Sequence, residues 1–282
     1  MRKTYKLYVG GAFVRSESGR SYPVRTPDGA FLANAARASR KDVRDAVRAA
    51  RAAFRAWSAA TAYNRGQVLY RVAELMEGRR AQLVAEVAAA EGVPAERAEA
   101  SVDAAVDRWV WYAGWPDKIA QVFGASNAVA GPYVTFSVPE PAGVVGVLAP
   151  RASALLGLVS VVAPVLAAGN ACVVVAAPDR PLPGVTLAEV LATADLPGGV
   201  VNLLTGHTAE LAPWLASHQD VNGLDLTGAD VEQRTALEVT AADTVKRIPR
   251  VRPGEPDWTA DPGTTRLTAF LETKTIWHPA GV

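Results

Sequence analysis

Few side chains in this sequence could carry covalent or metal chemistry. It contains one cysteine, Cys172, and three scattered histidines. A disulfide framework needs paired cysteines and a zinc site needs Cys or His ligands at close spacing, so both are excluded. Cys172 lies inside the apolar run 171–175, which predicts a buried strand. A thiol in such a strand is an inert small hydrophobic group, so we expect Cys172 to be structural and not a nucleophile.

Four polar residues follow predicted strands and are therefore candidates for contact with a ligand: Arg151, Asp179, Arg180 and His207. They could bind a small anion. Residues of solvated surface loops have the same composition, and we favour that second interpretation. His207 has no acidic partner near it in the sequence, so nothing assigns it a catalytic role.

The second half of the chain must position these residues, and it alternates between apolar strands and helices. Strands are predicted at residues 144–149, 171–176, 200–204 and 221–226. Helices are predicted at residues 155–167, 185–194, 209–217 and 230–246. This alternation predicts a parallel sheet with right-handed crossovers. Ligands of such sheets bind beyond the carboxyl ends of the strands, so a site is expected there.

The first half of the chain is predicted to contain β-hairpins and helices. Alternating apolar and polar residues around glycine turns predict short hairpins over residues 6–26. Ser39 followed by Asp42 predicts the start of a helix. Further helices are predicted at residues 63–76, 79–91 and 95–115, and a β segment at about residues 129–139. Near the end of the chain, a Pro- and Gly-rich linker is expected to precede a helical turn and a strand at residues 272–277.

Charge and hydropathy exclude several classes of partner. Lysine and arginine number 29 against 28 acidic residues, so no strong field favours nucleic acid or an anionic membrane. Residues 152–177 carry no charge, but Pro164, Gly169 and Asn170 interrupt them and favour a buried strand-helix-strand over a membrane helix. The start of the chain lacks the apolar core of a signal peptide. We expect a cytoplasmic protein.

Four longer motifs follow one another along the chain. They are Glu140-Pro-Ala-Gly-Val-Val-Gly-Val-Leu-Ala-Pro150, Ala163-Pro-Val-Leu-Ala-Ala-Gly-Asn170, Leu196-Pro-Gly-Gly-Val-Val-Asn-Leu-Leu-Thr-Gly206 and Leu226-Thr-Gly-Ala229. In this order they resemble the aldehyde dehydrogenase superfamily, as do residues 7–14 and 270–277. The resemblance implies an α/β fold with the Rossmann-like parallel sheet of the family's cofactor domain, N-terminal β-hairpins and helices, and a C-terminal oligomerisation arm.

At the positions of the family's active site, this sequence lacks the polar groups that the chemistry needs. The family's oxyanion-hole asparagine corresponds to Ala152, and the Lys and Glu that bind the adenosine ribose correspond to the apolar stretch 175–178. Ala229 replaces the hydroxyl that meets the pyrophosphate, and Asp230 adds a negative charge there. We therefore expect no catalytic residue, no metal and no bound cofactor. The vestigial NAD site comprises Pro150, Arg151, Ala152, Gly206, Thr227 and Gly228.

The resemblance also implies a domain organisation. In the family a catalytic domain, with its nucleophilic cysteine and general-base glutamate, stands between the cofactor domain and the tail, where this chain has the Pro-rich linker. We expect a NAD-binding-type domain at residues 1–246, with a β arm at about 125–140, a linker at 247–263 and an oligomerisation tail at 264–282. The tail is expected to be a free strand with the oligomerisation residues Phe270, Leu271, Ile276 and Trp277.

These expectations together indicate a truncated, catalytically degenerate family member, a pseudoenzyme. It would assemble with a full-length aldehyde dehydrogenase homologue as a structural or regulatory subunit of a hetero-oligomer, by addition of a β-strand. The alternative is an NAD-dependent aldehyde oxidoreductase subunit that retains weak cofactor binding. A third possibility is a scaffold that binds another metabolite through Arg151 and His207.

Overall fold

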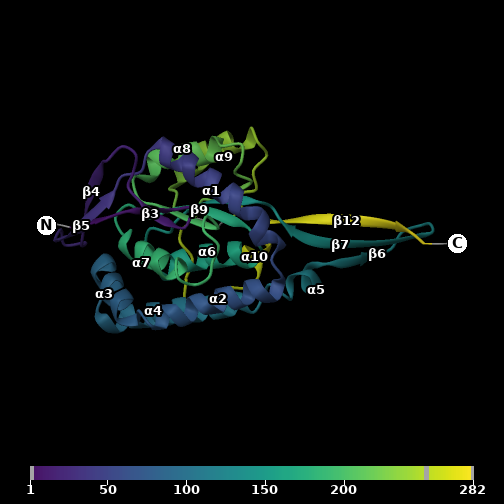
Figure 1. The fold of residues 1–282 in the computed structure, drawn as a ribbon, viewed down its shortest axis with the longest axis horizontal. Coiled ribbons are helices and arrows are strands. Elements are labelled where there is room, and N and C mark those ends of the chain that lie inside the picture. Colours follow the sequence, from purple (N-terminus) through teal and green to yellow (C-terminus); the bar gives the residue numbers. More distant parts are fainter. Residues whose placement is uncertain (1–2, 251–253, 281–282) are drawn as a thin grey trace.

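A six-stranded sheet with the order β11-β8-β9-β10-β2-β3 forms the centre of the fold (Figure 1). The computed structural model describes residues 3–250 and 254–280. The strands of this sheet are β2 (Leu7–Val9), β3 (Ala12–Val14), β8 (Val144–Leu148), β9 (Ala171–Val175), β10 (Val201–Leu204) and β11 (Gly223–Asp225). Strands β11, β8, β9 and β10 are parallel, which confirms the predicted α/β fold. The β2–β3 hairpin extends the sheet because β2 pairs antiparallel with β10.

Helices cover both faces of the sheet (Figure 1). One face carries α1 (Arg40–Ala59), α8 (Thr208–Ser217) and α9 (Val231–Ala242). The other carries α2 (Ala62–Glu77), α3 (Arg80–Glu91), α4 (Ala95–Ala113), α6 (Leu156–Ala167) and α7 (Leu182–Leu191). Two short helices are α5 (Ile119–Phe123) and α10 (Thr265–Thr268). The predicted start of α1 is confirmed, because Ser39 and Asp42 form a capping box.

Several element ends differ from the prediction for local reasons. Helix α4 stops at Ala113 because Gly114 caps it, with Pro116 close behind. Helix α9 stops at Ala242, since Val245 takes a positive φ of 52° and the N–H of Lys246 turns back to the carbonyl of Ala241. The prediction of hairpins within residues 6–26 is only partly right: β2 and β3 form one, but β3 and β4 (Ser21–Arg25) lie in different sheets. Two strands outside that segment, β1 (Thr4–Tyr5) and β5 (Phe31–Ala36), were not predicted. Strands β4 and β1 both pair with β5.

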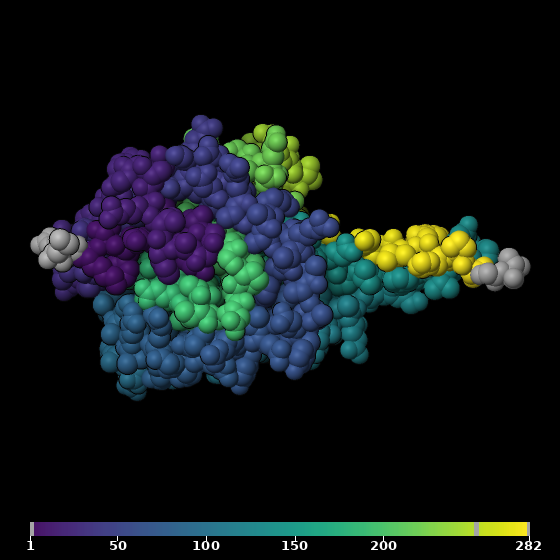
Figure 2. Space-filling model, in the orientation of Figure 1, coloured from purple at the N-terminus to yellow at the C-terminus, as the bar shows by residue number. Residues whose placement is uncertain are grey.

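A third sheet projects from the body as an arm (Figures 1 and 2). It consists of β6 (Ala125–Asn127), β7 (Tyr133–Pro141) and β12 (Leu271–Pro279) in the order β12-β7-β6. Strand β12 pairs antiparallel with β7 from Leu271 to Pro279. The strand predicted at 272–277 therefore exists, but the expectation of a free, unpaired strand is wrong, because β7 of the same chain covers one of its edges.

The base of this arm belongs to the core of the body. Phe270 is 2% exposed and its carbonyl accepts hydrogen bonds from the backbone of Ala142 and the side chain of Asn170. Leu271 is buried as well. Burial within their own chain leaves both side chains unavailable to a partner, so of the four proposed oligomerisation residues only Ile276 and Trp277 lie on the projecting part.

The segment predicted as a linker lies against the body. Its residues 251–253, like the terminal residues 1–2 and 281–282 of the predicted domains, lie outside the described part of the chain. Residues 254–263 form no helix, as predicted, yet Trp258 is buried. Across the described ranges no helix is long and apolar enough to cross a membrane.

Candidate functional site

The candidate site lies at the carboxyl ends of β8 and β11. These strands are neighbours at the point where the sheet reverses its strand order, the position where parallel sheets bind ligands. We call the space bordered by the loop after β8 (149–155) and the loop after β11 (226–230) the strand-end crevice. At one point these loops touch: a Cβ on Gly228 would lie 2.0 Å from the carbonyl oxygen of Ala149, so only glycine fits there.

Five of the six predicted cleft residues meet at this crevice, namely Pro150, Arg151, Ala152, Thr227 and Gly228. Gly206 does not join them. It follows β10, which lies two strands away from β8 in the sheet. Gly206 instead has a positive φ of 146° and passes close to the backbone of Ala38.

The crevice contains a carboxylate from the chain itself. Oε1 of Glu255 accepts hydrogen bonds from the backbone N–H groups of Arg151 and Ala152, the latter at 2.7 Å. Its Oε2 accepts from the indole N–H of Trp258 at 3.1 Å. Two adjacent backbone N–H groups and an indole therefore form an anion site whose anion is Glu255.

Residues around Trp258 and α10 hold this segment in place. The guanidinium of Arg108 donates to the carbonyls of Trp258 (2.7 Å) and Ala260 (3.0 Å). Arg266 forms an ion pair of 2.6 Å with Asp225 at the end of β11, whose side chain is only 3% exposed. The Arg266 guanidinium also lies 5.1 Å from the centre of the Trp258 ring. The contacts of Arg108 and of Arg266 together hold the Pro-rich segment against the strand ends.

The beginning of α9, beyond β11, is also closed to an anion. The side chain of Asp230 accepts a hydrogen bond of 2.8 Å from the backbone N–H of Gln233. This carboxylate caps the helix and places a negative charge where the helix dipole would otherwise attract phosphate. Of the N–H groups at the start of α9, the one of Gln233 is therefore occupied by Asp230.

The four polar candidates of the strand ends do not converge on one point. Arg151 and Asp179 face each other across 3.8 Å, and both side chains are more than half exposed. Arg180 donates to the carbonyl of Ala152 at 2.5 Å. His207, at the start of α8, packs its ring against Tyr22 with centroids 5.4 Å apart and borders the same pocket as Asp179 and Arg180.

The one thiol of the chain lies in the core. Cys172 is completely buried in β9, and this burial raises the pKa of its thiol to about 12. The thiolate needed for nucleophilic attack is therefore absent at neutral pH, which confirms the structural interpretation. The described residues also contain no group of three or more His, Cys, Asp or Glu that could hold a metal ion.

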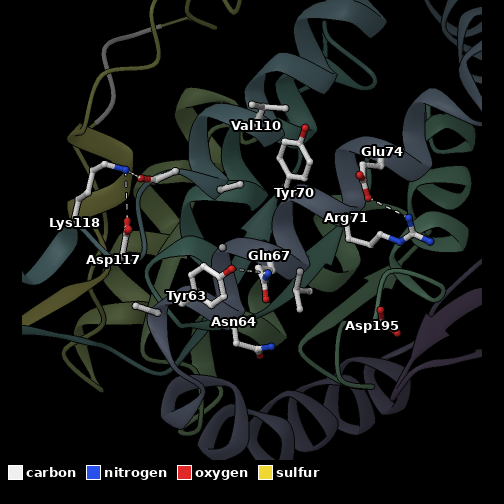
Figure 3. A pocket seen from close by; sticks show the side chains of 15 residues that line it. Tyr63, Asn64, Gln67, Tyr70, Arg71, Glu74, Val110, Asp117, Lys118 and Asp195 are labelled. Carbon is white, nitrogen blue, oxygen red and sulfur yellow. Dashed lines mark hydrogen bonds and ion pairs between the residues drawn. The ribbon is translucent and has the colours of Figure 1, made fainter.

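A groove of about 710 Å³ lies between α2 and α4 (Figure 3). None of the residues that line it belongs to the loops after β8 or β11. Four of its five charged side chains form two ion pairs, Arg71 with Glu74 at 3.1 Å and Lys118 with Asp117 at 3.5 Å, and the fifth is Asp195. Gln67 donates to the Tyr63 hydroxyl within the groove. Neither of these two ion pairs indicates a class of substrate, so we propose no activity for the groove.

The sequence motifs did not identify Glu255, Trp258, Arg266 or Arg108 as residues of the site. Glu255 and Trp258 lie in the segment 247–263, where the density of proline and glycine predicts only a linker, and Arg266 lies in the predicted tail. One signal was present: a tryptophan and an arginine, the side chains with most contact surface, stand in a stretch that a solvated linker would fill with small polar residues.

Comparisons with known proteins agree on one family. A model of the aldehyde dehydrogenase family matches residues 13–250. The mouse cytosolic 10-formyltetrahydrofolate dehydrogenase is 32% identical over 88% of this chain and 28% of its own length. For the mitochondrial benzaldehyde dehydrogenase of Antirrhinum majus, the values are 32%, 86% and 46%.

Solved structures give the same result. HpcC from Thermus thermophilus superimposes with a TM-score of 0.83 at 33% identity, over 88% of this chain and 48% of that one. An NAD+ complex of a Bacillus cereus aldehyde dehydrogenase gives a TM-score of 0.82 at 26% identity, over 87% of this chain and 50% of that one. The chain thus spans half or less of the length of these relatives.

Proposed function

The chain belongs to the aldehyde dehydrogenase family, and we propose that it is a non-catalytic subunit that assembles with a full-length aldehyde dehydrogenase as a structural or regulatory partner. One observation carries the proposal: the backbone N–H groups of Arg151 and Ala152 in the loop after β8 already donate to the carboxylate of Glu255, which also accepts from Trp258. A dinucleotide in the strand-end crevice would meet a carboxylate in place of open N–H donors.

The residues around the crevice do not fit NAD. Pyrophosphate is bound by free N–H groups and hydroxyls at a helix start, and here Asp230 occupies one N–H group of α9 and adds a negative charge. Glu255 adds a second negative charge at the loop after β8. The loop after β9 presents the apolar stretch 175–178 where a ribose needs polar partners. Losing two or three such hydrogen bonds, at about 1–3 kcal/mol each, weakens binding by several powers of ten. The proposed function therefore includes no reaction step that uses NAD.

The groups that aldehyde oxidation needs from the protein are equally absent from the described crevice. Attack on an aldehyde needs a thiolate, and the protonated Cys172 is enclosed in β9. The adduct needs a donor for its oxyanion, and Ala152 offers only a backbone N–H that Glu255 already uses. This supports a subunit without catalysis of its own.

The arm supports assembly with another chain. Strand β12 is an edge strand of its sheet, so one row of its backbone N–H and C=O groups has no partner strand among the described residues. Near the tip of the arm, Trp277 (57% exposed) packs edge-on against Tyr133 in a solvent-facing aromatic pair. Strand addition to the sheet of a partner would cover both features.

A thermal melt with millimolar NAD tests the cofactor half of the proposal. A ligand at one hundred times its dissociation constant adds about 2.7 kcal/mol of stability. We expect no change in Tm for this chain and a clear rise for a full-length aldehyde dehydrogenase as positive control. Stabilisation by NAD would contradict the proposal and favour the alternative, an oxidoreductase subunit with weak cofactor binding.

A further inference from the structure

The carboxyl ends of β9 and β10 border a pocket of about 570 Å³, and none of its lining residues belongs to the strand-end crevice. One wall is β4 and its turn, residues 22–27. The opposite wall is the loop after β9, residues 178–180, and His207 closes the end. The volume suits a small metabolite, and the place is again where parallel sheets bind ligands.

Strand β4 is fixed so that it presents polar groups to this pocket. Val24 is buried against Leu182 of α7, and Tyr22 packs at the edge of the same apolar cluster. The register of β4 against β5 shifts between Val24 and Arg25. Such a bulge redirects the next side chain, which here is an arginine that lines the pocket.

Two arginines, Arg25 and Arg180, line the pocket together with one carboxylate, Asp179, and the carboxylate of Glu91 lies near Arg180 outside the lining. Asp179 is 80% exposed and lies opposite Arg151, a residue outside the pocket that compensates its charge. The guanidinium of Arg180 donates through one nitrogen to the carbonyl of Ala152, and that of Arg25 through one nitrogen to the carbonyl of Gly29. Each guanidinium has five N–H donors, so both retain donors for a ligand.

The Tyr22 hydroxyl is the least satisfied polar group of the pocket. It is buried beside the backbone N–H of Gly206, and its own O–H donates to no acceptor in the described part of the chain. Burial also raises the pKa of Tyr22, so the hydroxyl keeps its proton and remains a donor. An acceptor atom of a ligand would remove the cost of this unmade hydrogen bond.

We propose that this pocket binds a small metabolite that carries a phosphate or carboxylate group, with Arg25, Arg180 and the Tyr22 hydroxyl as donors to the anion. Arginine forks match both groups in geometry. The imidazole of His207 supplies one further N–H donor in either protonation state. None of the proposed donors belongs to the six residues of the vestigial NAD site, so the proposal does not depend on the missing catalysis.

Isothermal titration calorimetry with inorganic phosphate and with acetate, at constant ionic strength, tests the site. We expect at least one of these anions to bind, and the tighter of the two assigns the ligand group. Tyr22→Phe removes only this hydroxyl, so we expect an unchanged or higher Tm without ligand and about five- to tenfold weaker binding. The double variant Arg25→Gln/Arg180→Gln is expected to lose detectable binding.

The control is Arg48→Gln, an exposed arginine on α1 that lies outside the pocket. It removes one of the two positive charges that the double variant loses, and it should bind as the unaltered chain does. Absence of binding by both anions would overturn the proposal. Equal weakening in Arg48→Gln, or unchanged affinity in Tyr22→Phe and in the double variant, would also overturn it, since the anion would then respond to net charge alone.

Discussion

The carboxylate of Glu255 should stabilise the loop after β8 to a measurable extent. It accepts two backbone hydrogen bonds from Arg151 and Ala152 and one from Trp258. Hydrogen bonds to a charged group contribute about 1.5–3 kcal/mol each when buried, and this loop is partly exposed. We therefore expect Glu255→Ala to cost about 2 kcal/mol in total and to lower the Tm by about 4–6 °C.

Two readouts separate this effect from general destabilisation. The amides of Arg151 and Ala152 lose their acceptor, so their hydrogen exchange should accelerate by about 30-fold, while amides in the core strands respond only through global stability. Glu255→Gln keeps the shape and one acceptor oxygen, and should cause about half the loss. The exposed Asp107 of α4 gives a control, for which Asp107→Ala should stay within about 0.5 kcal/mol. Unchanged exchange at the two amides in Glu255→Ala would refute the assignment of Glu255 as the anion of the crevice.

Two further substitutions test the packing around the site, and a third tests a carboxyl group on α3. Gly228→Ala places a Cβ 2.0 Å from a backbone carbonyl and should cost about 3 kcal/mol in chemical denaturation, whereas Gly78→Ala, whose Cβ would lie 3.5 Å from the nearest atom, should be nearly neutral. Arg266→Met leaves the buried carboxylate of Asp225 without its ion pair and should cost about 2–4 kcal/mol, part of which a second change of Asp225 to Asn restores. Burial raises the pKa of Glu86, so this carboxyl favours folding below its unfolded pKa and the benefit is lost as pH rises through the folded pKa. Glu86→Gln should therefore raise the Tm at pH 7.5 and have little effect at pH 4, and equal effects at both pH values would contradict this.

The parallel sheet was predictable because its strands are continuous apolar runs and its loops carry glycines that close contacts require. Gly228 illustrates this, since its contact with the backbone of the neighbouring loop tolerates no side chain. The loss of the family's polar groups could also be read directly, as at Ala152 and Asp230. These conclusions could be drawn from the sequence because each needs only the identity of the residue at one position of a local motif.

The contacts of the C-terminal segment were not predictable in the same way. Nothing in the sequence around Glu255 specifies that its carboxylate meets two N–H groups more than 100 positions earlier, because that pairing depends on the path of the chain between them. The same holds for Phe270, whose apolar side chain suggested an exposed strand. The structure places it in the core because β12 pairs with β7 and draws the base of the arm into the body.

The proposed hetero-oligomer is tested most directly by measuring the mass of the particle that this chain forms with a full-length aldehyde dehydrogenase from the same organism. Both proteins are co-expressed, and the product is measured by size-exclusion chromatography with light scattering. We expect one complex that contains both chains and that separates when residues 272–282 are deleted or when Trp277 is changed to Lys, whereas Trp214→Lys, at an exposed tryptophan of α8, should leave it intact. Two separate peaks from the unaltered chains, or a complex that persists without residues 272–282, would contradict the account.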